Sequence, residues 1–333
     1  MNKPLVSICC NTFNQEKYIG SALDGFLMQK TTFPIEVIVH DDASTDGTAA
    51  IVSDYAKKYP HLIFPILQRE NQLSKGVKPL LHYDLPRARG KYLALCEGDD
   101  YWTDPHKLQK QVDFLEANAD YGLSHTDVKI CRQKQSDLTD PRDNVKNLAE
   151  PGTDLKERIL LSTYIIRTPT VVMRRKLLLD LLDQDPFLFH SDYFRMGDTP
   201  LWVELANVSK LHYLPEATAV YRMHGGSATR QTNVTKQMRF MLSMFDLRMY
   251  FDRKYRFSEA YSQTIRRKYQ QVLFDYQVLH PGYEPLHPSE NGHGGIRQTM
   301  VRSRAGLVAY RRYVLVYYRF LPALQAVYRK LRR

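Results

Sequence analysis

The sequence predicts an α/β protein with a mostly parallel central sheet and a C-terminal helical extension. In the first third of the chain, short apolar runs with strand character alternate with segments whose apolar residues recur at helical spacing. That alternation is typical of parallel sheets. From Met238 onward the pattern is mainly helical, apart from a Pro-, Gly- and His-rich break over residues 280–295. The composition, 43% hydrophobic and 25% charged, argues against a disordered chain.

We expect buried strands where an apolar run is bounded by turn residues. These runs are residues 5–10, 35–39, 62–67, 92–96 and 171–173. Helices are predicted over residues 16–29, 105–115 and 176–182, and after the second strand. Ser44 or Thr45 can cap that second helix, and Pro60 ends it. Beyond Tyr121 the pattern loosens, and the polar residues 132–154 predict an exposed connection or flap.

The net charge of +11 is concentrated near the C-terminus. Residues 228–333 contain 20 Lys and Arg against 6 Asp and Glu, whereas residues 1–227 contain 27 against 30. We therefore predict a near-neutral domain over residues 1–227 and a basic helical region over residues 228–333. A basic region suits nucleic acid or an anionic membrane. Nucleic acid is the weaker candidate, because no recognised binding module accompanies the charge.

The end of the chain predicts an amphipathic helix, kinked at Pro322. Its apolar stripe comprises Leu307, Tyr310, Val314, Tyr317, Leu321, Leu324, Tyr328 and Leu331. Most of the arginines lie off that stripe, which is typical of a helix on an anionic membrane surface. The same pattern also suits a helix that packs on its own protein with a solvated basic face. No charge-free stretch approaches the ~20 apolar residues of a membrane span.

Three carboxylates follow the strand predicted over residues 92–96, in the segment Glu97-Gly98-Asp99-Asp100. Carboxylates held so close repel one another, so a fold that gathers them usually supplies a cation. Oxygen ligands suit Mg²⁺ or Mn²⁺, often shared with substrate phosphates. The alternative is a solvated acidic turn.

Two more polar segments follow predicted strands. Residues 11–14 come after the first strand, and Asp41 with Asp42 after the second. Each segment alone could be a helix cap or a capped turn. Ligands of open α/β sheets gather at the carboxyl ends of the strands, so the three segments together predict a binding site there.

Three stretches resemble glycosyltransferase family 2, whose members are inverting, metal-dependent enzymes with the GT-A fold. They are Pro4-Leu-Val-Ser-Ile with Asn11-Thr-Phe-Asn14, Ile35-Glu-Val-Ile-Val-His-Asp-Asp-Ala-Ser-Thr-Asp-Gly-Thr48, and Gly90-Lys-Tyr-Leu-Ala-Leu-Cys-Glu-Gly-Asp-Asp100. The likeness covers about residues 4–227, and it is specific because the motifs occur together in this order. It implies a GT-A domain that transfers a sugar from a nucleotide.

The resemblance implies roles for the residues at the strand ends. Thr12, Phe13 and Asn14 would lie beside the nucleotide, and Phe13 stands where the family usually has Tyr. Asp42 would accept a hydrogen bond from uracil, which favours a UDP-sugar.

The acidic segment stands where the family carries Asp-x-Asp. Asp99 would approach the ribose, and Asp100 would hold Mn²⁺ or Mg²⁺ at the diphosphate. Glu97 replaces the family's Asp and is a further candidate metal ligand.

Two later segments extend the resemblance. Gly197-Asp-Thr-Pro-Leu-Trp202 resembles the acidic segment that supplies the general base, which makes Asp198 the catalytic candidate. The alternative for Asp198 is a helix N-cap before Pro200. Ala219-Val-Tyr-Arg-Met-His-Gly-Gly-Ser227 resembles a closing loop, in which Arg222 would stabilise the departing nucleotide and His224 would complete the metal site.

The resemblance implies a hexosyl- or N-acetylhexosaminyltransferase for cell-surface polysaccharide or lipopolysaccharide. Its donor would be a UDP-sugar, and its acceptor a saccharide or a lipid-linked saccharide. Four cysteines without a C-x-x-C pair predict a cytoplasmic protein, peripheral on the inner face of the bacterial cytoplasmic membrane.

Other enzyme classes are disfavoured, because neither a basic Gly-rich phosphate loop nor G-x-G-x-x-G follows the first strand. Such motifs would indicate a nucleotidyltransferase or a dinucleotide-dependent oxidoreductase. The alternative from a different class is a catalytically inactive membrane adaptor.

Overall fold

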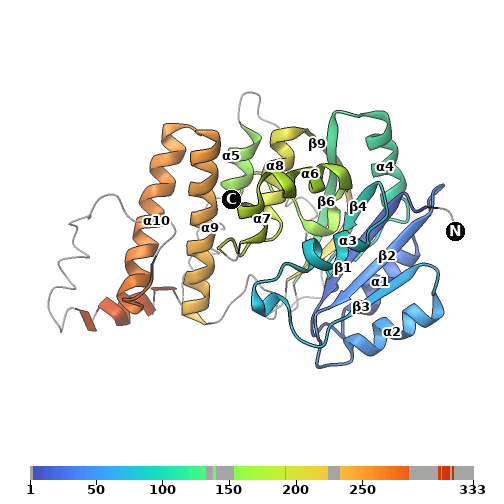
Figure 1. The fold of residues 1–333 in the computed structure, drawn as a ribbon, viewed down its shortest axis with the longest axis horizontal. Helices are drawn as coiled ribbons and strands as arrows, with labels where there is room; N and C mark the ends of the chain where they lie inside the picture. Colours follow the sequence, from blue (N-terminus) through green and yellow to red (C-terminus); the bar gives the residue numbers. More distant parts are fainter. Residues whose placement is uncertain are drawn as a thin grey trace. The chain divides into compact units, whose positions relative to one another are not determined.

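The computed structural model describes residues 3–132, 138–139, 154–191, 193–223, 233–284, 307–308, 310–315 and 317–318. It contains two compact units (Figure 1). Unit 1 comprises Met1–Asp192 and Gly197–Met223, and unit 2 comprises Tyr193–Met196 and His224–Arg333. The predicted domain boundary after residue 227 lies outside the described residues. The α/β class is confirmed.

Unit 1 is built on one mixed sheet. Its strands are β1 (Val6–Thr12), β2 (Ile35–Asp41), β3 (Ile63–Leu67), β4 (Tyr92–Leu95), β5 (Tyr101–Trp102), β6 (Tyr121–Arg132), β7 (Leu138–Thr139), β8 (Val172–Arg174) and β9 (Lys210–Met223). They are ordered β3-β2-β1-β4-β8-β6-β9-β5, and β7 pairs with β6. The four strands β3, β2, β1 and β4 are parallel. Strand β8 is antiparallel to both of its neighbours.

The helices of unit 1 connect these strands. They are α1 (Ile19–Leu27), α2 (Thr48–Lys58), α3 (Leu85–Arg87), α4 (Lys107–Ala117), α5 (Leu155–Leu160), α6 (Arg175–Gln184), α7 (Pro186–His190) and α8 (Thr199–Val208). The predicted cap of α2 is wrong. Asp46 accepts the hydrogen bond from the Thr48 backbone N–H at 3.0 Å, whereas the Ser44 hydroxyl donates to Asp41.

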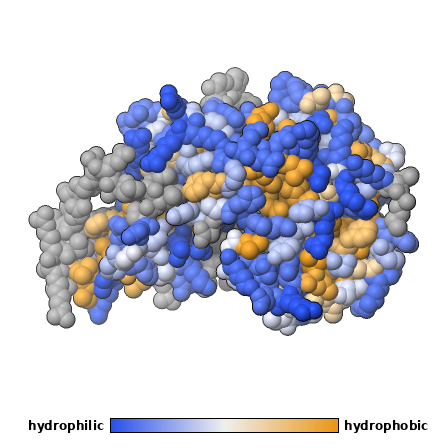
Figure 2. Space-filling model, in the orientation of Figure 1, coloured by the Kyte–Doolittle hydropathy of each residue, from blue (hydrophilic) through white to orange (hydrophobic). Residues whose placement is uncertain are grey.

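The core of unit 1 lies between the sheet and its helices. Apolar side chains of β1, β2 and β4 pack against the buried faces of α1 and α4. Phe26 of α1 and Trp102 of β5 meet edge to face, with ring centroids 4.8 Å apart. In the view of Figure 2, hydrophilic residues cover much of the surface and hydrophobic residues occupy smaller areas between them.

Strands β6 and β9 fall where the sequence pattern loosens, and they pair with each other along most of their length. The reason is a buried polar layer: Ser124, His125 and Thr126 of β6 are each 0% exposed. The hydroxyls of Thr126 and Thr218 share a hydrogen bond of 2.7 Å. Burial lowers the pKa of His125 to about 3, and its Nε2 lies 2.7 Å from the Tyr164 hydroxyl.

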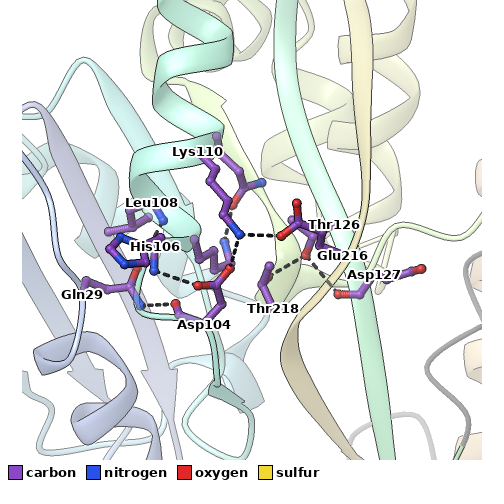
Figure 3. A network of polar contacts seen from close by, with 11 residues as sticks. Gln29, Asp104, His106, Leu108, Lys110, Thr126, Asp127, Glu216 and Thr218 are labelled. Carbon is purple, nitrogen blue, oxygen red and sulfur yellow. Dashed lines mark hydrogen bonds and ion pairs between the residues drawn. The ribbon is translucent and has the colours of Figure 1, made fainter.

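An ion-pair network also joins α4 to β9 (Figure 3). The Lys110 ammonium donates to Asp104 at 2.9 Å and to Glu216 at 2.5 Å. Asp104 accepts in addition from the backbone N–H of His106, at the start of α4. These contacts fix the middle of β9 within unit 1.

Unit 2 contains the helices α9 (Val234–Tyr255) and α10 (Glu259–Leu279), which pack side by side (Figure 1). The expected helical region is interrupted at Arg256, whose φ of 52° ends α9 in the left-handed conformation. Ser258 then caps α10 through a hydrogen bond from the Tyr261 N–H.

The described part of the predicted amphipathic helix packs on α10. Residues 307–308, 310–315 and 317–318 are helical, and Tyr310, Val314 and Tyr318 are buried. The hydroxyls of Tyr310 and Tyr318 donate to Asp275 of α10 at 2.5 and 3.0 Å. Two members of the predicted apolar stripe, Tyr310 and Val314, therefore face the protein. The remainder of that helix lies outside the described residues, among which no helix is long and apolar enough to span a membrane.

Candidate active site

The three polar segments meet at one edge of the sheet, as expected, because β2, β1 and β4 are parallel neighbours. Thr12 pairs directly with Asp41 across β1 and β2. The Asp42 N–H donates to the Thr12 carbonyl at 3.0 Å, and the Gly98 N–H donates to the Asn11 carbonyl at 2.9 Å. The backbone itself thus holds the acidic segment against the end of β1.

Gly98 explains why the acidic segment can lie so close to β1. A Cβ at this position would be 2.7 Å from the Thr12 Oγ1 and 2.6 Å from the Gln15 Oε1. The Thr12 hydroxyl in turn donates to Gln15 at 2.8 Å. Only glycine fits here without a shift of these groups, so a side chain would push the carboxylates away from the strand end.

The segment after β1 is tied to the segment after β2. Asn14 has a φ of 52°, and its Oδ1 accepts a hydrogen bond from the Thr45 N–H at 2.8 Å. Its own N–H donates to the Ser44 hydroxyl at 2.9 Å. Phe13, between these anchored residues, is 43% exposed. The turn therefore presents an aromatic ring to solvent at the strand edge.

Asp42 is nearly buried, and its carboxylate is held by a neighbouring loop. Its Oδ1 accepts from the Gln72 N–H at 2.7 Å and its Oδ2 from the Leu73 N–H at 3.0 Å. The Asp42 carbonyl accepts from the Asn71 side chain. The carboxylate thus positions residues 71–73 at the end of β2.

The acidic segment combines burial with mutual repulsion. Burial, together with Glu97 and Asp99, raises the pKa of Asp100 well above its ordinary value. Burial, together with Asp99 and Asp198, raises the pKa of Glu97 to about 8, although a hydrogen bond with Thr168 opposes the shift. The Glu97 Oε2 is buried without a hydrogen-bond partner in the described part of the chain. A positive charge beside these carboxylates would stabilise their ionised form.

The donor set fits a divalent cation, although the described residues contain no assembled metal site. No three His, Cys, Asp or Glu side chains among those residues are already placed to hold an ion. His224, the predicted third ligand, lies outside them. The orphaned oxygen of Glu97 and the buried Asp100 are hard oxygen donors of the type that Mg²⁺ and Mn²⁺ prefer.

Arg222 fixes the end of β9 on the acidic segment. Its backbone N–H donates to the Asp100 carboxylate at 2.7 Å, and its guanidinium donates to the Asp99 carbonyl at 2.9 Å. The guanidinium carbon lies 4.3 Å from the ring centroid of Tyr101 and 5.2 Å from that of Tyr18. A cation is thereby held beside the carboxylates.

Asp198 occupies the N-cap of α8, which was the alternative reading of this residue. Its Oδ1 accepts the Thr199 N–H at 2.7 Å. Because its charge also raises the pKa of Glu97, Asp198 lies within electrostatic range of the acidic segment. The cap and a place beside the acidic segment are therefore compatible.

The turn before β8 belongs to the same neighbourhood but was not predicted. Thr168 is hydrogen-bonded to Glu97, and the Trp102 indole donates to the Pro169 carbonyl at 2.8 Å. The Arg167 guanidinium lies over the Tyr221 ring, 4.6 Å from its centroid. A signal was present, since Arg167-Thr-Pro-Thr170 directly precedes β8, the neighbour of β4.

This fold, with acidic residues at the carboxyl edge of a sheet that is parallel in its first half, defines the GT-A class of nucleotide-sugar transferases. The chain matches glycosyl transferase family 2 over residues 7–182 and belongs to that family. The predicted family and fold are thus confirmed.

Similar sequences come from several bacteria. An uncharacterised protein of Mycobacterium tuberculosis is 40% identical over 223 residues, which cover 66% of this chain and 59% of the relative. The putative glycosyltransferase EpsE of Bacillus subtilis is 35% identical over 127 residues, 38% of this chain and 44% of the relative. The chain thus spans about 59% of the length of the mycobacterial protein.

Two solved structures share the fold. The mannosyltransferase PcManGT from Pyrobaculum calidifontis, in complex with GDP-Man and Mn²⁺, has a TM-score of 0.57 at 18% identity, covering 99% of this chain and 89% of that one. S. aureus TarS 1–349, in complex with UDP-GlcNAc, has a TM-score of 0.53 at 19% identity, covering 94% and 91%.

Proposed function

We propose that the protein is an inverting glycosyltransferase that moves a hexosyl or N-acetylhexosaminyl group from a nucleotide sugar to a saccharide or lipid-linked acceptor. The synthesis of cell-surface polysaccharide or lipopolysaccharide is the corresponding process. The observation that carries this proposal is the cluster of neighbouring carboxylates, Glu97, Asp99 and Asp100, held against the end of β1 beside Arg222.

A divalent cation, Mn²⁺ or Mg²⁺, is the proposed cofactor. Asp100 would hold it, with Glu97 and His224 as further ligands. When bound, the ion neutralises charge on the departing diphosphate. The Mn²⁺ bound by the similar mannosyltransferase supports this assignment.

The nucleotide would lie along the edge formed by the ends of β1 and β2. The exposed ring of Phe13 offers a stacking surface for a base, and Thr12, Asn14 and Asp42 flank it in the anchored turns. Asp99, whose carbonyl accepts from Arg222, is assigned to the ribose. UDP is the expected nucleotide, and GDP is the alternative suggested by the mannosyltransferase.

Transfer needs one displacement. As the acceptor oxygen forms a bond to the anomeric carbon, the bond from that carbon to the diphosphate oxygen breaks, which inverts the centre. Asp198 takes the proton of the acceptor hydroxyl. The Arg222 guanidinium stabilises the negative charge that the departing nucleotide carries.

The basic C-terminal region is proposed to place this site at the inner face of the cytoplasmic membrane. Among its described residues, Tyr313 and Leu315 are exposed, 46% and 43% respectively. They could enter an anionic lipid surface while Tyr310 and Val314 remain packed on α10.

A thermal-shift panel tests the function. UDP-glucose, UDP-GlcNAc, GDP-mannose and the free nucleotides, each with and without Mn²⁺, should separate donors from non-donors, because a ligand that binds the native state raises its unfolding temperature. The stabilising donor should then release its nucleotide during incubation with protein. No stabilisation and no release with any donor would favour the inactive adaptor.

A further inference from the structure

We propose that Arg167 binds an anionic group of the acceptor, a phosphate or a carboxylate, so that the acceptor is an acidic saccharide or a phosphorylated one. This inference rests on the transfer function proposed above. It assigns a substrate-binding role to the turn that precedes β8.

The first step is that Arg167 is held in place from both sides. Its carbonyl accepts hydrogen bonds from the Thr170 N–H at 2.9 Å and the Thr170 hydroxyl at 2.7 Å. The carbonyl of Pro169, two residues further along the turn, accepts from the Trp102 indole. The guanidinium carbon lies over the Tyr221 ring, 4.6 Å from its centroid, so little side-chain freedom remains to be lost on binding.

The second step is that the charge of Arg167 has no ion-pair partner in the described part of the protein. Its guanidinium forms no ion pair with the described carboxylates, and its Nε–H is buried without a hydrogen-bond partner there. A buried donor without an acceptor is costly. A phosphate or carboxylate matches the planar fork of a guanidinium and would satisfy it.

The third step is that Arg167 and Arg222 serve different sides of the site. Arg167 stacks on Tyr221, and Arg222 is the next residue of β9. Successive side chains of a strand point to opposite faces, so the two cations lie on opposite faces of β9. Arg222 contacts Asp99, which is on the nucleotide side of the proposed site.

Arg167 borders the acidic segment from the face of β9 opposite to Arg222. The adjacent Thr168 is hydrogen-bonded to Glu97, and we assign the acceptor to this face because Arg222 serves the donor diphosphate. An acceptor must bring its hydroxyl to Asp198. An acidic group elsewhere on the same acceptor can therefore reach Arg167 while the donor diphosphate occupies the Arg222 side.

Calorimetry on the full chain tests this, with inorganic phosphate as the probe. Phosphate is titrated into protein saturated with UDP and Mg²⁺, and UDP is titrated separately. We expect Arg167→Gln to weaken phosphate binding about tenfold or more, the loss typical for a charge-assisted contact, without changing the affinity for UDP. Arg167→Lys, which keeps the charge, should lose less.

Arg158, on α5, provides a matched control because its guanidinium also lies over a tyrosine ring. Its Cζ is 5.5 Å from the ring centroid of Tyr164. Arg158→Gln should bind phosphate like the wild type.

Equal phosphate affinity of Arg167→Gln and the wild type, or no phosphate binding by the wild type, would overturn the proposal. Weaker UDP binding with unchanged phosphate binding would also overturn it, since the anion would then belong to the donor. A wild type that ignores UDP contradicts the proposed function instead, and phosphate titration without nucleotide still tests Arg167.

Discussion

At the scale of single residues, Asp198 caps α8 and is the proposed general base, and a one-atom substitution can separate these two roles. Its Oδ1 caps α8 by accepting the Thr199 N–H, and an asparagine oxygen can accept the same bond. An amide cannot take up the proton of an acceptor hydroxyl. Capping and general-base chemistry should therefore respond differently to the same substitution.

We expect Asp198→Asn to lose at least ~10²-fold in transfer rate, the low end for a general base, with donor binding and unfolding temperature close to the wild type. Steady-state kinetics with the donor found in the thermal-shift panel measures the first effect. Near-normal turnover would mean that the base lies elsewhere.

Asp84, at the end of a π-helical turn over Leu80–Asp84, should make stability pH-dependent. Burial raises the pKa of Asp84 to about 8, whereas an unfolded Asp titrates near 3.9. The folded state thus keeps a proton that the unfolded state releases, and the free energy of unfolding should fall as the pH rises from about 4 through 8.

Asp84→Asn replaces the titratable carboxyl group with an amide of nearly the same shape. The wild type should lose stability between pH 5 and pH 8, and the variant should lose less. Urea unfolding of both proteins at both pH values measures this difference. If both proteins show the same change between these pH values, Asp84 does not hold the proton in the folded state.

At the scale of elements, the site depends on how closely the acidic segment lies against β1. Gly98→Ala would place a methyl group within 2.7 Å of the Thr12 Oγ1, so we expect weaker nucleotide binding and a lower unfolding temperature. Gly20→Ala in α1 is the control, because its Cβ would meet only the Tyr55 hydroxyl, at 3.9 Å. That variant should be as stable as the wild type, or more so. Equal behaviour of the two variants would show that the close approach is not needed.

The elements also show which parts of the structure a sequence can reveal. Strands β1, β2 and β4 are apolar runs followed by turn residues, so both the strands and the meeting of their polar ends were predictable. Strand β6 was not predictable. Its residues Ser124, His125 and Thr126 are polar, and their hydrogen-bond partners are far away in the sequence.

For the same reason, the place of Arg167 in the site could not be predicted from the sequence. Its place over Tyr221 depends on β8 pairing with β4 and on β9 pairing with β6. Neither pairing leaves a local pattern, because the partners are many residues apart. The motif residues themselves were identified through the family resemblance, and their individual roles remain predictions.

At the scale of the whole molecule, the basic C-terminal region should bind anionic membranes. Each Lys or Arg near such a surface contributes about 1 kcal/mol, and salt weakens this term. The intact chain should co-sediment with phosphatidylglycerol vesicles more than with phosphatidylcholine vesicles, and a chain ending at residue 295 should not.

Truncation also removes the contacts of Tyr310 and Tyr318 with Asp275, so point variants are needed. Arg312→Gln with Tyr313→Ser alters two exposed positions and should reduce sedimentation. Arg266→Gln on the exposed side of α10 is the matched control. Undiminished sedimentation of both the truncated chain and the double variant would favour a helix that only packs on its own unit.

The central claim is that the acidic segment couples a divalent cation to a nucleotide diphosphate, and calorimetry of UDP with and without Mn²⁺ tests it most directly. The wild type and Asp113→Ala, which loses an exposed carboxylate of α4, should bind UDP more tightly with Mn²⁺. Asp100→Ala should lose that enhancement, together with transfer activity. UDP binding that Mn²⁺ still strengthens in Asp100→Ala would contradict the account.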